Sequence, residues 1–150
     1  MSGINPLNAM LKLALATAKS QYEFFLRTAE NSQVTEVKAL LMVLAETESE
    51  MMGKIQHMIA SGILDEIEEL HRAKDRNEIP DETPFDPARA ESDPRIFVCN
   101  LALEKSIKTY TFYLTMATKT KSEAVSTLFE YLALLEMRQI RELRRVCCTF

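Results

Sequence analysis

Apolar residues recur every three or four positions along most of this chain, which is the spacing of one face of an α-helix. Three glycines and five prolines are too few to interrupt this pattern often, and no stretch carries the signals of a β-strand. The pattern therefore predicts an all-α protein built from four long helices.

The first two predicted helices are separated by a short polar break. Asn5 followed by Pro6 is typical of an N-cap and a first helical turn, so the first helix is expected to run from there to about residue 29. Ser32 is the predicted N-cap of a second helix, which continues to about residue 60 and ends near Gly62. The residues predicted to be buried on the first helix are Leu11, Ala14, Leu15, Ala18, Tyr22, Phe25 and Ala29.

The last two predicted helices also have recognisable starts. Asp93 is the predicted cap of a third helix, with Pro94 in its first turn, and this helix reaches about residue 117. Thr120 and Glu123 have the spacing of a capping box, which predicts a fourth helix from there to about residue 148.

A long connection separates the two halves of the chain. Residues 63–76 are acidic and then basic, which predicts a short solvated helix supported by pairs of opposite charge one turn apart. Residues 77–94 contain four prolines and are expected to be extended. We therefore expect two helical hairpins joined by one long crossover.

One motif occurs twice in the chain. Residues 44–51 and 132–139 both begin Leu-Ala-x-x-Glu, which places glutamates at Glu48 and Glu136. The same offset of 88 residues pairs Tyr22 with Tyr110 and the aromatic pair at 24–25 with that at 112–113. We interpret the chain as a duplicated helical hairpin, in which a glutamate from each half can reach one internal site.

Composition restricts the class of protein. At 150 residues the chain is expected to form a single domain, residues 1–150, that needs no disulfide. A net charge of -4 argues against a general nucleic-acid binder, and no run approaches the roughly 20 apolar residues of a membrane span. Cys99, Cys147 and Cys148 have neither zinc-knuckle nor redox-motif spacing, so we expect reduced thiols in a cytoplasmic protein.

The repeated frame resembles the ferritin-like domain of rubrerythrins, over essentially the whole chain. Its register is set by Phe24-Phe25 and Phe112-Tyr113, each followed one helix later by the Leu-Ala-x-x-Glu motif. The resemblance implies a ferritin-like four-helix bundle of two duplicated hairpins, with a long crossover between helices 2 and 3. In that family the first and third helices each supply one Glu to a di-iron site, and the second and fourth each supply a Glu-x-x-His pair.

Most of the ligands that the resemblance implies are replaced in this chain. Glu48 and Glu136 match the glutamates of the two Glu-x-x-His pairs. The positions at which other residues stand are Ala18 and Ser106, where a Glu is implied, and Met51 and Gln139, where a His is implied. His57 lies on the opposite face of its helix from Glu48 and does not restore the set. The resemblance therefore implies a degenerate di-iron site.

The surroundings of the two glutamates lead to further expectations. We expect both side chains to be buried and, without a metal, to share a proton, because desolvation and mutual repulsion each raise a carboxylate pKa. Candidate hydrogen-bond partners are Tyr22, Tyr110, Ser106 and Gln139, although both tyrosines can also be simple core residues. The methionines expected to fill the core are Met51, Met52, Met116 and Met137.

Three functions remain open from the sequence. The first is a non-catalytic rubrerythrin-like bundle without a cofactor, a homodimeric scaffold or interaction protein with an unknown protein partner. The second is a residual metalloprotein in which Glu48, Glu136, Gln139 and water hold one divalent ion, iron or manganese, with a weak oxidoreductase, peroxide-scavenging or storage role. The third is a carrier of a small apolar ligand. We expect no catalytic residue, and if the chain is an enzyme the resemblance implies a rubrerythrin-type oxidoreductase.

Overall fold

The computed structural model describes residues 6–61 and 80–150, and this part of the chain is helical with no strand. The helices are α1 (Pro6–Asn31), α2 (Thr35–Ser61), the short α4 (Pro87–Ala90), α5 (Pro94–Lys119) and α6 (Glu123–Cys147). The prediction of an all-α protein is therefore confirmed. The expected features at Asn5, at Gly62 and in residues 63–76 lie outside the described residues.

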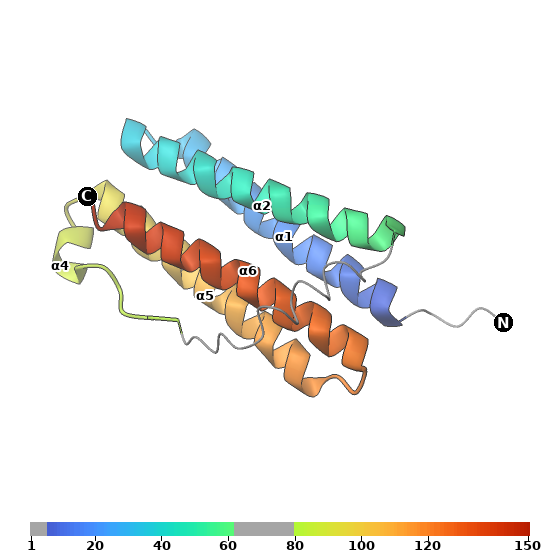
Figure 1. Cartoon of the computed structure of the whole chain (residues 1–150). Coiled ribbons are helices and arrows are strands. Elements are labelled where there is room, and N and C mark those ends of the chain that lie inside the picture. Colours follow the sequence, from blue (N-terminus) through green and yellow to red (C-terminus); the bar gives the residue numbers. More distant parts are fainter. Residues whose placement is uncertain (1–5, 62–79) are drawn as a thin grey trace.

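The four long helices form two hairpins that lie lengthwise against each other (Figure 1). One hairpin is α1 with α2, and the other is α5 with α6. None of the described helices is long and apolar enough to cross a membrane.

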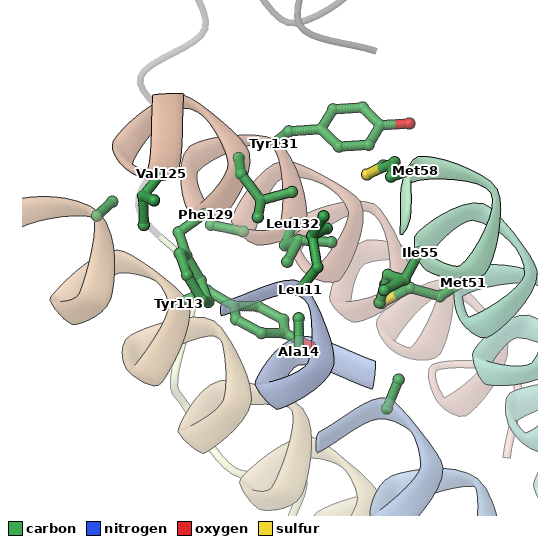
Figure 2. Close-up of a cluster of buried hydrophobic side chains, with 14 residues drawn as sticks. Leu11, Ala14, Met51, Ile55, Met58, Tyr113, Val125, Phe129, Tyr131 and Leu132 are labelled. Atoms are coloured by element: carbon green, nitrogen blue, oxygen red, sulfur yellow. The ribbon is translucent and has the colours of Figure 1, made fainter. Parts of the chain in front are cut away.

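The apolar core is divided into two clusters. In the first, α1 contributes Leu11 and Ala14, α2 contributes Met51, Ile55 and Met58, and α5 and α6 contribute Tyr113, Val125, Phe129, Tyr131 and Leu132 (Figure 2). The second contains Phe25, Leu41, Leu44, Cys99, Leu103 and Leu143, among others. Along every long helix the two clusters are separated by a buried polar residue, so a polar layer crosses the middle of the bundle.

Burial follows the repeat that the sequence suggests. Positions 88 residues apart are buried together in both hairpins, as shown by Phe25 and Tyr113, or by Glu48 and Glu136. Met51 and Met137 are buried and Met52 and Met116 pack against the core, as expected. Within the predicted stripe of α1, Leu15 and Tyr22 are only half-buried.

The helix caps differ in part from the predictions. Asp93 accepts a hydrogen bond from the backbone amide of Arg95, which confirms it as the N-cap of α5. The predicted cap at Ser32 is wrong, because α2 begins at Thr35 and the Ser32 hydroxyl accepts from the amide of Val34 in the preceding turn.

The predicted capping box is also wrong. Thr120 terminates α5, and its hydroxyl accepts from the amide of Ser122. Ser122 is the N-cap of α6, accepting from the amide of Val125 at 3.3 Å. Both hydroxyl residues have an extended backbone, but only Ser122 accepts from an amide in the first turn of α6.

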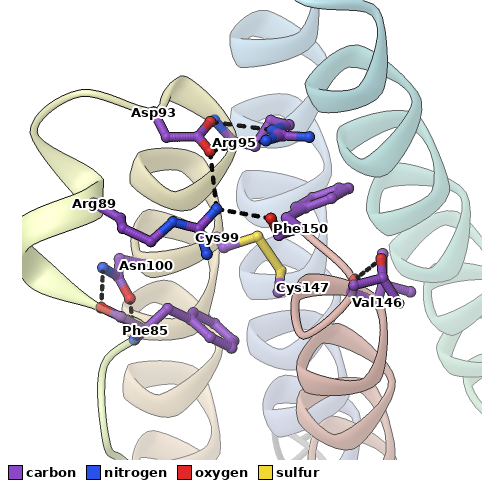
Figure 3. Close-up of a disulfide and its surroundings, with 10 residues drawn as sticks. Phe85, Arg89, Asp93, Arg95, Cys99, Asn100, Val146, Cys147 and Phe150 are labelled. Atoms are coloured by element: carbon purple, nitrogen blue, oxygen red, sulfur yellow. Dashed lines mark hydrogen bonds and ion pairs between the residues drawn. A yellow bond between two sulfur atoms is a disulfide. The ribbon is translucent and has the colours of Figure 1, made fainter.

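The second half of the crossover is held against the second hairpin. It contains the short helix α4 where an extended chain is expected. Arg144 of α6 donates from Nε to the carbonyl of Asp81 at 3.1 Å and from Nη2 to that of Thr83 at 2.6 Å. Asn100 of α5 pairs with both backbone groups of Phe85 (Figure 3).

A disulfide between Cys99 and Cys147 contradicts the expectation of reduced thiols (Figure 3). It joins the N-terminal part of α5 to the end of α6, with the two Cα atoms 6.2 Å apart. Both cysteines are buried, whereas Cys148 is free and exposed. Since disulfides persist mainly in oxidising compartments, the cytoplasmic location loses the support of cysteine usage and stays a prediction.

The chain terminus is fastened beside this disulfide. Arg89 donates to the carbonyl of Phe150 at 2.7 Å, and the guanidinium of Arg95 lies 5.4 Å from the centre of the Phe150 ring. Asp93 forms ion pairs with both arginines (Figure 3). One end of the second hairpin is thus secured by a covalent bond and by polar contacts.

Candidate functional site

The polar layer receives side chains from all four long helices. Its buried members are Gln21 of α1, Glu48 of α2, Ser106 and Thr109 of α5, and Glu136 and Gln139 of α6. Each lies three or four residues from an apolar core residue on its own helix, and residues at that spacing share a helix face. Packing of the apolar residues on either side therefore brings these polar groups inside the bundle.

The amide of Gln21 bridges the two glutamates. Its Nε2 lies 2.5 Å from Oε1 of Glu48 and 3.1 Å from Oε1 of Glu136, and donates to both. An amide nitrogen has two hydrogens, so it can satisfy one oxygen of each carboxylate at once. The Thr109 hydroxyl donates to Oε1 of Gln21 and thereby orients the amide.

Burial changes the acidity of both glutamates. Desolvation raises the pKa of Glu48 to about 7, and the amides of Gln21 and Gln139 oppose the shift. The pKa of Glu136 is raised by its complete burial and then by the charge of Glu48, against the effect of Gln21 and Ser106. Two carboxylates in this setting do not both ionise readily at neutral pH, so the pair retains a proton there.

Several other buried atoms of the layer have no hydrogen-bond partner among the described residues. They are Oε2 of Glu48 and of Glu136, Oγ of Ser106, the hydroxyl of Tyr113 and both amide atoms of Gln139. Ser106 and Gln139 lie close enough to lower the pKa of a glutamate, but neither completes a hydrogen bond among the described residues. The layer is therefore satisfied around Gln21 and incompletely satisfied on the side of α5 and α6.

The predicted site residues are placed partly as expected. The expected burial of Glu48 and Glu136 is confirmed, and both are joined through Gln21. The tyrosine beside them is the fully buried Tyr113, whose pKa is raised by burial and by the charges of both glutamates. Tyr22 and Tyr110 are half-buried and pack against the second apolar cluster.

Sequence reasoning missed Gln21, Thr109 and Tyr113. Gln21 and Thr109 are 88 residues apart, and each follows by three residues a position where the resemblance implies a ligand. A residue three positions along a helix lies on the same face. Gln21 and Thr109 could have been found because they are polar residues at equivalent positions on otherwise apolar helix faces.

The donor set does not fit a di-iron centre. Two of the implied ligand positions are apolar, Ala18 and Met51, and two are neutral, Ser106 and Gln139. No group of three or more His, Cys, Asp or Glu side chains that could hold a metal occurs in the described ranges. Moreover, Gln21 directs N–H donors at one oxygen of each glutamate, where an ion would need lone pairs.

Two surface hollows reach the polar layer from different helix pairs. One of about 300 Å³ lies along α1 and α5 and is lined by Ala16, Thr17, Ser20, Gln21, Lys105 and Thr109. The other, of about 240 Å³, lies along α2 and α6 and includes Met51 and Gln139 in its lining. Side chains of the layer thus line both hollows, Gln21 and Thr109 the first and Gln139 the second.

Comparisons of this chain with protein-family models, with curated proteins and with solved structures find no match.

Proposed function

We propose that this chain is a non-catalytic ferritin-like bundle of the rubrerythrin type that works as a homodimeric scaffold or interaction protein. The observation that carries this proposal is the Gln21 amide between Glu48 and Glu136. In this account an amide of the chain itself takes the place that a cation would have between the two carboxylates. An amide stabilises carboxylate oxygens by hydrogen bonding but supplies no redox chemistry.

The proposed ancestry is supported by the repeat. Equivalent positions of the two hairpins are buried alike, and their glutamates meet in one central layer. In this proposal the hairpins are duplicates, and the chain between them is the long crossover of a ferritin-like bundle.

The proposed loss of metal chemistry is supported by the replaced ligands. Hard divalent ions need several oxygen ligands, and iron in such bundles also takes imidazole. Here Met51 offers only a thioether and Ala18 offers no donor. A site with two carboxylates can instead lower its charge from -2 to -1 by keeping one proton.

One observation favours a second candidate, a residual site for one iron or manganese ion. Oε2 of Glu48, Oε2 of Glu136 and Oε1 of Gln139 are buried oxygens without a hydrogen-bond partner among the described residues. These three atoms are the ligands that such an ion would use, together with water. The bound ion would supply the weak redox or storage chemistry.

Metal analysis of protein purified without chelators separates the two candidates. The first predicts less than stoichiometric iron and manganese in the wild-type chain. Gln21→Glu removes the N–H donors and adds a third carboxylate, so this variant should gain affinity for a divalent ion. Gln56→Glu makes the same chemical change at an exposed position of α2 and should gain none. Stoichiometric metal in the wild-type protein would overturn the first candidate.

A further inference from the structure

The groove along α2 and α6 has an apolar interior and a charged rim. Val43, Leu44, Met51 and Leu135 contribute the apolar lining. Val43 is 53% exposed, and its neighbour Met42 is 49% exposed on the same helix. Because Val43 belongs to the lining and is largely exposed, the apolar surface of the groove is open to contact with another molecule.

The charged residues on the rim occupy equivalent positions of the two hairpins. Glu50 and Lys54 stand on α2, and Arg138 and Glu142 stand on α6. Arg138 occupies the position of the second hairpin that Glu50 occupies in the first, 88 residues earlier, and Glu142 corresponds to Lys54 in the same way. Equivalent positions therefore carry opposite charges.

We propose that this groove binds a second copy of the same chain, with Glu50 of each copy facing Arg138 of the other. This inference rests on the proposed scaffold function and identifies the surface that the homodimer would use. A two-fold interface is isologous, so a contact between Glu50 and Arg138 occurs twice. A rim of one sign would repel a second copy, whereas this rim attracts it.

The two charged residues are available for such contacts. Both are exposed, and neither forms an ion pair within residues 6–61 and 80–150. Lys54 and Glu142 are already engaged, the first donating to the Tyr131 hydroxyl at 3.4 Å and the second paired with Arg145. Charges at the rim fix the orientation of the partner, while the apolar lining supplies the affinity.

Docking at this groove would also affect the polar layer. Gln139 and Met51 form part of the groove lining, and each follows by three residues a glutamate of the layer on the same helix. A second copy would cover this side, so the dimer would separate Gln139 from bulk water. The interface and the former ligand positions would then form one continuous surface.

Charge exchange tests the proposal on the full chain. The wild-type protein should sediment at twice the monomer mass of 17.1 kDa. Glu50→Arg alone and Arg138→Glu alone should each sediment as monomers, because each places like charges together twice. An equimolar mixture of these two variants should recover the dimer mass, since every pair is then opposite, and so should the double variant.

The controls keep folding and function separate from assembly. Glu104→Arg changes an exposed charge on α5 and should leave the dimer intact. Recovery in the mixture shows that both single variants are folded. A monomeric wild type, or single variants that remain dimeric, would overturn the proposal. Metal content measured on the same samples tests the metal-free part of the proposed function independently, whereas a monomeric wild type would also contradict its homodimeric part.

Discussion

The two hairpins bury equivalent positions but place different chemistry there. Three such positions are apolar in the first hairpin and polar in the second: Ala18 and Ser106, Phe25 and Tyr113, Met51 and Gln139. At a fourth position both are polar, and Thr109 donates to Gln21 across the bundle. Besides its glutamate, the first hairpin contributes only Gln21 to the buried members of the polar layer named above. Both polar atoms of the Gln21 amide have hydrogen-bond partners.

The two hairpins therefore differ in the free-energy cost of their buried polar groups. A buried polar group without a partner costs about 1–3 kcal/mol, and the second hairpin contains most of these groups. The same hairpin contains the Cys99–Cys147 disulfide and the contacts of Arg89 and Arg95 with the chain terminus. The hairpin with the less satisfied interior is thus the one with the stronger fastening at its end.

Removing the disulfide should produce the largest effect. Cys99→Ala with Cys147→Ala opens a link between residues 48 apart, and we expect a loss of about 3–4 kcal/mol in the free energy of unfolding. Urea unfolding followed by circular dichroism measures this change. Cys148→Ala alters an exposed thiol and should stay within about 0.5 kcal/mol of the wild type. Equal stability of the double variant and the wild type would show that the disulfide does not stabilise the second hairpin.

The next effect should be seen in the pH dependence of stability. The folded-state pKa of Glu48 is raised from 4.5 to about 7, so its contribution is fully present below pH 4.5 and is lost as pH rises through 7. We expect a decrease on the order of 3 kcal/mol across this window. Carboxylates with lowered pKa, such as Asp93, act in the opposite direction at lower pH. The difference between the wild type and Glu48→Gln, measured at each pH, gives the contribution of Glu48 together with its effect on the titration of Glu136.

A smaller effect is expected from the bridge itself. Gln21→Leu leaves Oε1 of both glutamates without the amide donor, which should destabilise the fold by about 1–2 kcal/mol at neutral pH. Gln56→Leu is the surface control, with an expected change below about 0.5 kcal/mol. Thermal melts of both variants provide the comparison. A Gln21→Leu protein as stable as the control would show that the bridge is not needed.

The smallest effect is expected from a substitution that makes the second hairpin resemble the first. Gln139→Met installs the residue found at position 51 and removes two buried amide atoms that lack partners among the described residues. We expect stabilisation by about 1 kcal/mol, because an unsatisfied polar group is exchanged for an apolar one of similar size. The change should appear as a higher midpoint in urea. Destabilisation would mean that Gln139 has a partner in solution.

Much of this arrangement could be predicted from the sequence. The helix periodicity depends on many residues, so errors at single positions do not affect it, and the four long helices are found close to their expected bounds. Glu48 and Glu136 are predicted as a pair because a repeated motif identifies both. Single hydroxyls carry less information, and the sequence therefore predicts caps at Ser32 and Thr120 although other residues begin those helices.

The remaining features depend on tertiary contacts. Gln21 resembles any polar helix residue until the neighbouring helices show which oxygens surround it. Cys99 and Cys147 are 48 residues apart, and only the antiparallel packing of α5 and α6 brings them together. Cysteine spacing along the sequence therefore could not indicate their bond.

The metal-free pair of glutamates is tested by the melting temperature of Glu48→Gln with Glu136→Gln, measured with a chelator and with added iron or manganese. If the glutamates form a metal-free pair bridged by Gln21, replacing both by neutral amides should leave the melting temperature unchanged or raise it. Neither metal nor chelator should then shift the wild type or the variant. The opposite result has two parts: metal raises the melting temperature of the wild type, and the double variant melts at a lower temperature that metal does not restore. This result would show that the carboxylates hold an ion, because a ligand of the native state adds its binding free energy to stability.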